Sequence, residues 1–89
     1  WKLEEPSSAE PIYLSGELNI RSGRTAMALT QYREAVARDP GHALAWNGLV
    51  RASMHAREIH LARQAYDRLA SLSAVLSSRI AHEFPEVLR

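Results

Sequence analysis

Apolar residues recur at intervals of three and four positions along most of the chain, the spacing that places them on one face of an α-helix. Gly23 and the run Asp39-Pro40-Gly41 interrupt this pattern. Glycine accepts the positive φ found where helices end, and proline biases the residue before it away from the α region. We therefore predict helices over residues 9–22, 24–38 and 42–56, and a further helix from residue 58 onward. No segment shows the alternation typical of β-strands, so the expected fold class is all-α.

The last third of the chain leaves two interpretations open. No Gly or Pro follows residue 58 until Pro85, and an apolar stripe keeps helical spacing through several serines: Ala62, Tyr66, Leu69, Leu76 and Ile80. Either a turn near Ser73 begins a fifth helix, or the fourth helix continues to about Phe84. The turn is favoured because Ser is more common at helix caps than in helix interiors.

The sequence repeats weakly at a fixed interval. Shifting the chain by the distance from Ala9 to Ala43 also places Ala28 on Ala62 and Tyr32 on Tyr66. The surrounding residues resemble the tetratricopeptide repeat (TPR) family, in which one unit follows another at this interval. The matching segments are Ala28-x3-Tyr32-x2-Ala35-x4-Pro40 for the second half of one repeat, Trp46-x2-Leu49 for the first half of the next, and Ala62-x3-Tyr66 for its second half.

The resemblance implies antiparallel helix hairpins stacked as a right-handed TPR-like superhelix, an α-solenoid fragment. Its parts would be a linker or arm over residues 1–8, repeats over 9–42 and 43–74, and a C-terminal capping helix or tail over 75–89. Small residues such as Ala28 and Ala62 would let helices approach closely, and Trp46 is expected in the core. Arg57 stands where Gly23 stands in the first unit. A left-handed conformation costs a residue with a Cβ about 1 kcal/mol, so we expect another turn geometry there.

The resemblance also implies a partner-binding concave face, formed mainly by the first helix of each pair. Carried over position by position, the candidate contacts are Tyr13, Glu17 and Ile20 from the first unit, Leu44, Asn47, Arg51 and His55 from the second, and Ser78 and His82 from the tail. A subgroup of the family holds a C-terminal carboxylate with Lys, Asn and Arg. The matching positions here carry Tyr13, Glu17, Gly48, Ser78 and His82, so we expect no clamp of that kind.

Composition narrows the function classes. Eleven basic and ten acidic residues give a net charge of +1, which argues against a general nucleic-acid surface. No apolar run approaches the roughly 18 residues of a membrane span, so we expect no membrane insertion. The absence of Cys excludes disulfides and thiolate metal sites, and the four His are not spaced as a helical zinc motif. No nucleophile elbow or phosphate-binding glycine loop occurs, so we expect no enzyme activity, no metal and no cofactor.

The leading hypothesis is a protein–protein interaction module, a scaffold or adaptor that binds a peptide or protein on the concave face. Arg supplies ten of the eleven basic residues, which suggests a bacterial source. The start at Trp1, without an initiator Met, suggests a piece of a longer protein, and we expect the module to belong to a larger assembly. Two alternatives stay open: a spacer or self-association element of a longer TPR array in a secretion, pilus or exopolysaccharide export system, and a helical accessory domain of a regulator. Self-association would use the repeat ends, because about three repeats are usually needed for stability. No targeting segment is visible, and the cytoplasm and the periplasm are both compatible.

Overall fold

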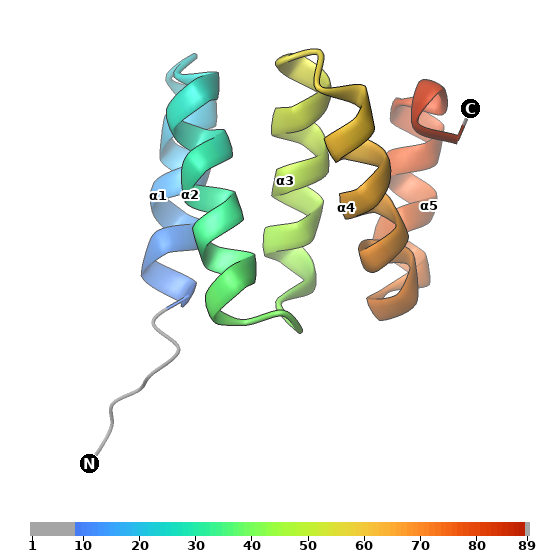
Figure 1. Cartoon of the computed structure of the whole chain (residues 1–89), viewed down its shortest axis with the longest axis horizontal. Helices are drawn as coiled ribbons and strands as arrows, with labels where there is room; N and C mark the ends of the chain where they lie inside the picture. The colour runs from blue at the N-terminus through green and yellow to red at the C-terminus, as the bar shows by residue number, and fades with distance from the viewer. Residues whose placement is uncertain (1–8, 89) are drawn as a thin grey trace.

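The computed structural model describes residues 9–88, which form five α-helices and a short 3₁₀ turn (Figure 1). The helices are α1 (Ala9–Arg21), α2 (Thr25–Arg38), α3 (Ala43–His55), α4 (Ile59–Leu72) and α5 (Ala74–Glu83), followed by η1 (Pro85–Leu88). No strand occurs among residues 9–88, so the all-α prediction is confirmed for this part of the chain. The predicted arm over residues 1–8 lies outside the described residues, as does Arg89.

Successive helices run in opposite directions and lie side by side in chain order in Figure 1. The helices α1 and α2 form one hairpin, and α3 and α4 form a second. Both hairpins have a first helix of 13 residues and a second of 14 residues. Each helix boundary of the first hairpin recurs in the second after the interval that separates Ala9 from Ala43. The spacing of the sequence pattern is therefore also the spacing of the helices.

The turns inside the two hairpins share the same hydrogen bonds. Arg24 N–H donates to the Asn19 carbonyl at 2.8 Å, and Glu58 N–H donates to the Ser53 carbonyl at 2.8 Å. In each turn the preceding residue also donates to a carbonyl three positions back, which completes a Schellman motif. The residue at the left-handed position is Gly23 in the first turn, with φ 80°, and Arg57 in the second, with φ 65°.

The expectation of a different turn at Arg57 is thus wrong. The Schellman hydrogen bonds satisfy carbonyl groups at the end of α3 that would otherwise lack partners. Two such bonds outweigh a conformational cost of about 1 kcal/mol. The side chain of Arg57 is exposed, so no packing constraint opposes this geometry.

A break separates α4 from α5 at Ser73. This residue is extended, with φ −153° and ψ 106°, and its Oγ accepts a hydrogen bond from the Leu76 N–H at 3.2 Å. Ser73 is therefore the N-cap of α5. The favoured interpretation of the sequence is confirmed, and a single helix continuing to Phe84 is wrong.

Tyr32 of α2 fills the space where three helices meet. Its side chain is buried, and its ring packs against Gly16 of α1 and Gly48 of α3. A Cβ at Gly16 would lie 2.9 Å from Tyr32 Cε1, and one at Gly48 would overlap the ring. Glycine is required at these positions for the close approach of the helices, and not for an unusual φ.

The small residues predicted to permit close packing are buried. Ala28 and Ala62 are fully inaccessible and belong to one apolar cluster that spans the helices. Trp46, expected in the core, is instead half-buried at its edge. Its indole N–H donates to the Pro40 carbonyl at 2.8 Å, which holds the ring beside the loop between α2 and α3.

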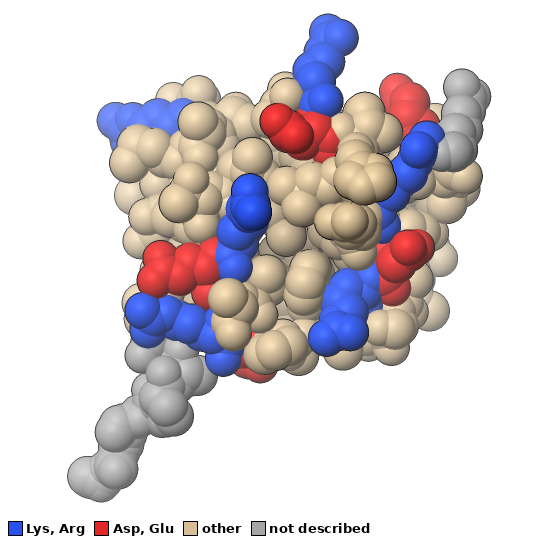
Figure 2. Space-filling model, viewed as in Figure 1, with Lys and Arg blue, Asp and Glu red and all other residues tan. Residues whose placement is uncertain are grey.

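Charged side chains are mixed on the face seen in Figure 2. Acidic and basic groups lie interspersed over the helices there, without a continuous field of one sign. The balance of charge in the sequence is therefore visible on this face of the fold. The prediction that the chain does not bind nucleic acid stays a prediction.

Candidate functional site

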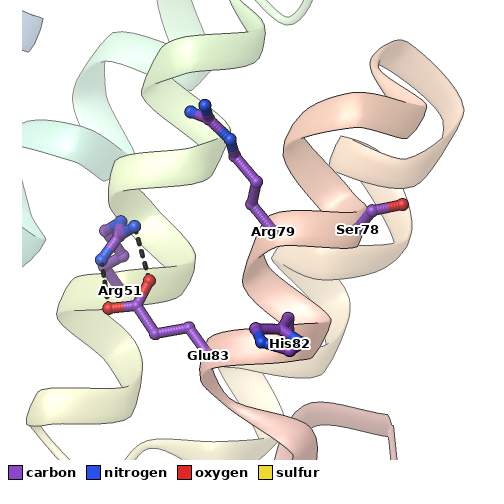
Figure 3. Close-up of a pocket in the computed structure, with 5 residues that line it drawn as sticks. All are labelled: Arg51, Ser78, Arg79, His82 and Glu83. Atoms are coloured by element: carbon purple, nitrogen blue, oxygen red, sulfur yellow. Dashed lines mark hydrogen bonds and ion pairs between the residues drawn. The ribbon is translucent and has the colours of Figure 1, made fainter.

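An open groove of about 690 Å³ lies between α3 and α5 (Figure 3). We call it the α3–α5 groove, and its lining residues are Arg51, Ser78, Arg79, His82 and Glu83. The last four belong to α5, where spacings of three and four residues place side chains on one helix face. The opposite face of α5 holds Ile80 and Ser77, which are buried against the other helices. Burial of that face therefore leaves the polar face exposed beside α3, with Arg79 extending toward α3 in Figure 3.

A bidentate ion pair crosses the groove. Arg51 Nη1 donates to Glu83 Oε2 at 2.9 Å, and Arg51 Nη2 lies 2.7 Å from Glu83 Oε1. The two side chains remain 37% and 46% exposed. Exposed pairs contribute only about 0–1 kcal/mol, so a ligand carboxylate can compete with Glu83 for Arg51 at small cost.

The groove carries more positive than negative charge. Two guanidinium groups, from Arg51 and Arg79, face a single carboxylate from Glu83. Within residues 9–88 Arg79 forms no ion pair. In Figure 3 its side chain extends from α5 toward α3, away from the Arg51–Glu83 pair. A planar guanidinium in this position suits a carboxylate, which it can bind through two hydrogen bonds.

An aromatic residue borders the groove at one end. The His55 ring meets the Phe84 ring edge-on, with centroids 6.0 Å apart, and the Arg51 guanidinium lies 6.0 Å from the Phe84 centroid. The contact between α3 and α5 thus gathers several of the residues predicted from the sequence: Arg51, His55, Ser78 and His82.

Tyr13 and Glu17 belong to a second cluster, between α1 and the start of α3. The Tyr32 hydroxyl donates to Glu17 Oε2 at 2.5 Å, and the Tyr13 ring lies 6.2 Å from the Tyr32 ring and 4.9 Å from that of His42. Burial raises the pKa of the Tyr32 phenol above its ordinary value of 10.0, and the bond to Glu17 raises this pKa further. Burial also raises the pKa of Tyr13. Both phenols are therefore neutral near pH 7.

His42 ties this second cluster to the first hairpin. Its Nδ1 accepts from the Ala45 N–H at 3.1 Å and so caps α3, while its Nε2 lies 2.8 Å from Glu10 Oε1 on α1. A ring nitrogen that accepts from an N–H carries no proton, which assigns the proton to Nε2. These contacts join α1 to α3, and they explain the cluster as a packing contact between hairpins.

The other predicted residues lie outside the α3–α5 groove. Ile20 packs against the apolar cluster, Asn47 is half-buried, and Leu44 is exposed near the start of α3. The groove is also lined by Arg79 and Glu83, which are not among the residues predicted from the sequence. The sequence signal for them is their helical spacing from Ser78 and His82, which places all four side chains on one face of the same helix.

Among the described residues, no group of three His, Cys, Asp or Glu side chains is placed to hold a metal ion. None of the helices formed by residues 9–88 combines the length and the apolar character that crossing a bilayer requires. Comparison with models of known protein families finds no match to this chain, and comparison with curated proteins finds none either.

Proposed function

We propose that this chain is a protein-interaction module that binds an acidic peptide segment in the α3–α5 groove. The observation that carries the proposal is the pair of guanidinium groups of Arg51 and Arg79, opposed by Glu83 alone. An acidic side chain or a C-terminal carboxylate would bind Arg79 and compete with Glu83 for Arg51. In this proposal the chain is a scaffold or adaptor and not an enzyme.

The helix arrangement supports a second part of the proposal, that the chain is a fragment of a TPR-like α-solenoid. Two hairpins of equal helix lengths follow one another at the interval of the sequence repeat, with the same turn in each. In such arrays each unit packs on its neighbours, and successive units build an extended binding surface. In this proposal α5 caps the second unit, and the α3–α5 groove lies between that unit and its cap.

Binding of a labelled glutamate-rich peptide, followed by fluorescence anisotropy, tests the groove. Arg79→Glu should weaken binding by about tenfold or more, a loss of about 1.4 kcal/mol, because it replaces attraction by repulsion. Arg63→Glu is the matched control, since Arg63 is an exposed arginine of α4 outside the groove. Asn47→Ala should also leave binding unchanged. An equal loss in Arg79→Glu and Arg63→Glu would indicate attraction to net charge only and would contradict the proposal.

Self-association is a second candidate function, favoured by the outer face of the first hairpin. Leu14 and Leu18 are 54% and 64% exposed, and Met27 is also exposed. Their equivalents in the second hairpin are Gly48, Ala52 and Leu61, which are buried or half-buried between the helices. Sedimentation over a range of concentrations tests this function. Oligomers that dissociate in a Leu14→Lys/Leu18→Lys variant would support it, and a strict monomer at high concentration would exclude it.

A further inference from the structure

A second groove, of about 380 Å³, opens between the two hairpins on the side formed by α2, α3 and α4. We call it the tryptophan groove. Its apolar lining residues are Val36, Trp46, Leu49, Leu61 and Ala65. It shares no lining residue with the α3–α5 groove. Its volume is within the range of about 300–1,000 Å³ that is usual for ligand pockets.

Packing explains why this space remains open. Ala65 is buried and small, so α4 contributes little volume toward α3. Trp46 cannot turn in to fill the gap without losing its hydrogen bond to the Pro40 carbonyl. Leu49 and Val36 are buried below the surface and form an apolar base. The groove therefore presents apolar surface beside the face of a half-buried indole.

Positive charge borders the apolar lining on both sides. Arg33 of α2 and Arg68 of α4 line the groove, together with Gln64, and no carboxylate does. The Arg68 guanidinium lies 5.8 Å from the centroid of the Trp46 ring. Neither arginine forms an ion pair within the part of the chain that the structure describes. Figure 2 shows basic side chains on either side of an uncharged area over α3.

We infer that the tryptophan groove binds an apolar side chain of an acidic partner segment, with a residue such as Leu or Phe inserted and Asp or Glu on both sides of it. The apolar lining removes the inserted side chain from water, and the two arginines attract the flanking carboxylates. Trp and Arg are also the residues most often found at the energetic centres of protein interfaces. This inference concerns a different face from the α3–α5 groove and does not depend on the function proposed there.

The first hairpin provides an internal comparison. The equivalents of Leu61, Gln64, Ala65 and Arg68 on α4 are Met27, Thr30, Gln31 and Glu34 on α2, and these line a surface depression of their own. There Glu34 replaces Arg68, and Gln31 replaces Ala65. Glu34 pairs with Arg38 at 3.0 Å, so this depression offers a carboxylate where the tryptophan groove offers a guanidinium. An acidic segment would meet no guanidinium among the residues that line this depression.

Fluorescence of Trp46 tests the inference directly. The chain has two tryptophans, so Trp1→Phe leaves Trp46 as the only tryptophan, which excitation at the red edge of the absorption band selects over the tyrosines. The probe is a Trp-free peptide with a central Leu flanked by glutamates. Two control peptides replace the Leu by Ala or the glutamates by lysines. We expect a saturable change in Trp46 emission with the first peptide, and binding at least about tenfold weaker, or about 1.4 kcal/mol, with either control.

Three variants locate the bound peptide. Arg68→Glu should weaken the binding that Trp46 reports about tenfold or more, whereas Glu34→Arg, the equivalent position on α2, should leave it unchanged. The third variant, Arg79→Glu, distinguishes this groove from the α3–α5 groove. Circular dichroism of each variant checks that the helices are retained. Loss of binding in Arg79→Glu but not in Arg68→Glu would place the peptide in the α3–α5 groove and overturn the inference while supporting the proposed function. Equal binding of the Leu and Ala peptides, or no response of Trp46, would also overturn it.

Discussion

The two hairpins have the same helix lengths and the same turns, yet they bury different surfaces. The second hairpin packs against α2 on one side and α5 on the other, and its Gly48 and Ala52 are buried. The first hairpin has a neighbour on one side only within the described residues, and the equivalent Leu14 and Leu18 are exposed. A hairpin of this kind cannot bury its own apolar residues, so its stability depends on what stacks against it. The comparison predicts that the first hairpin opens more readily than the second.

The largest test of this comparison removes the two equivalent tyrosines. Tyr32→Ala should lower the free energy of unfolding by about 3–5 kcal/mol, because the side chain is buried among three helices. Tyr66→Ala should cost clearly less, because Tyr66 is half-buried. Urea denaturation followed by circular dichroism measures both. Equal losses would show that the tyrosines pack alike and that the hairpins do not differ in this respect.

A smaller effect is expected from adding one methyl group beside Tyr32. Gly48→Ala should destabilise the fold by about 1–3 kcal/mol, since the new Cβ would overlap the Tyr32 ring. This loss opposes the gain of about 1 kcal/mol that Ala has over Gly in a helix. Gly41→Ala is the control, because its Cβ would meet only Asp39 Oδ1 at 3.6 Å. Thermal melting of both variants measures the difference. If Gly48→Ala were no less stable than Gly41→Ala, the Tyr32 ring would be free to move away from the added methyl group.

The pair formed by Tyr32 and Glu17 gives the first hairpin a dependence on alkaline pH. The folded state raises the pKa of Tyr32, whereas in the unfolded chain the phenol titrates near pH 10. The stability that comes from this shift is complete below about pH 10 and is lost as the pH rises further, by up to about 1.4 kcal/mol per pH unit. Tyr32→Phe should flatten this fall. Urea unfolding at several alkaline pH values measures it, and parallel curves for both proteins would contradict the assignment.

The smallest expected effects concern the equivalent turns. Gly23→Ala should destabilise the fold by about 1 kcal/mol, because φ 80° is unfavourable for a residue with a Cβ. Arg57→Gly should stabilise it by up to a similar amount, since Arg57 adopts φ 65°. Chemical denaturation resolves changes of this size. The same sign for both substitutions would mean that the turns differ in energy despite their shared hydrogen bonds.

Much of the helix pattern could be predicted from the sequence because the boundaries depend on local chemistry. Gly23, Pro40 and Ser73 each favour a turn or a cap through their own backbone or side chain. The turn at Arg57 could not be predicted this way, because backbone hydrogen bonds to the end of α3 decide it against the local preference. Trp46 was expected in the core, but its place depends on a contact with Pro40 across the loop.

The candidate site was less predictable than the helices. Arg51 and His82 were selected by position, but the groove also requires Arg79 and Glu83. Their orientation depends on the rotation of α5 about its axis, which Ile80 and Ser77 set by packing on the other helices. The tryptophan groove depends on a gap left beside Ala65, and a gap between helices has no signature in the sequence. The shapes of both grooves therefore depend on packing between distant segments, which local sequence patterns do not predict.

The ion pair between Arg51 and Glu83 would link ligand binding in the α3–α5 groove to the contact between α3 and α5. The pair joins α3 to α5. A ligand carboxylate in the groove would bind the same Arg51 guanidinium. If a carboxylate ligand binds Arg51 as proposed, its binding and the packing of α5 on α3 would be coupled equilibria, and such coupling acts equally in both directions. Under the proposed function, a bound acidic segment would weaken the contact of α3 with α5, and contacts that draw α5 away from α3 would increase the affinity for the segment.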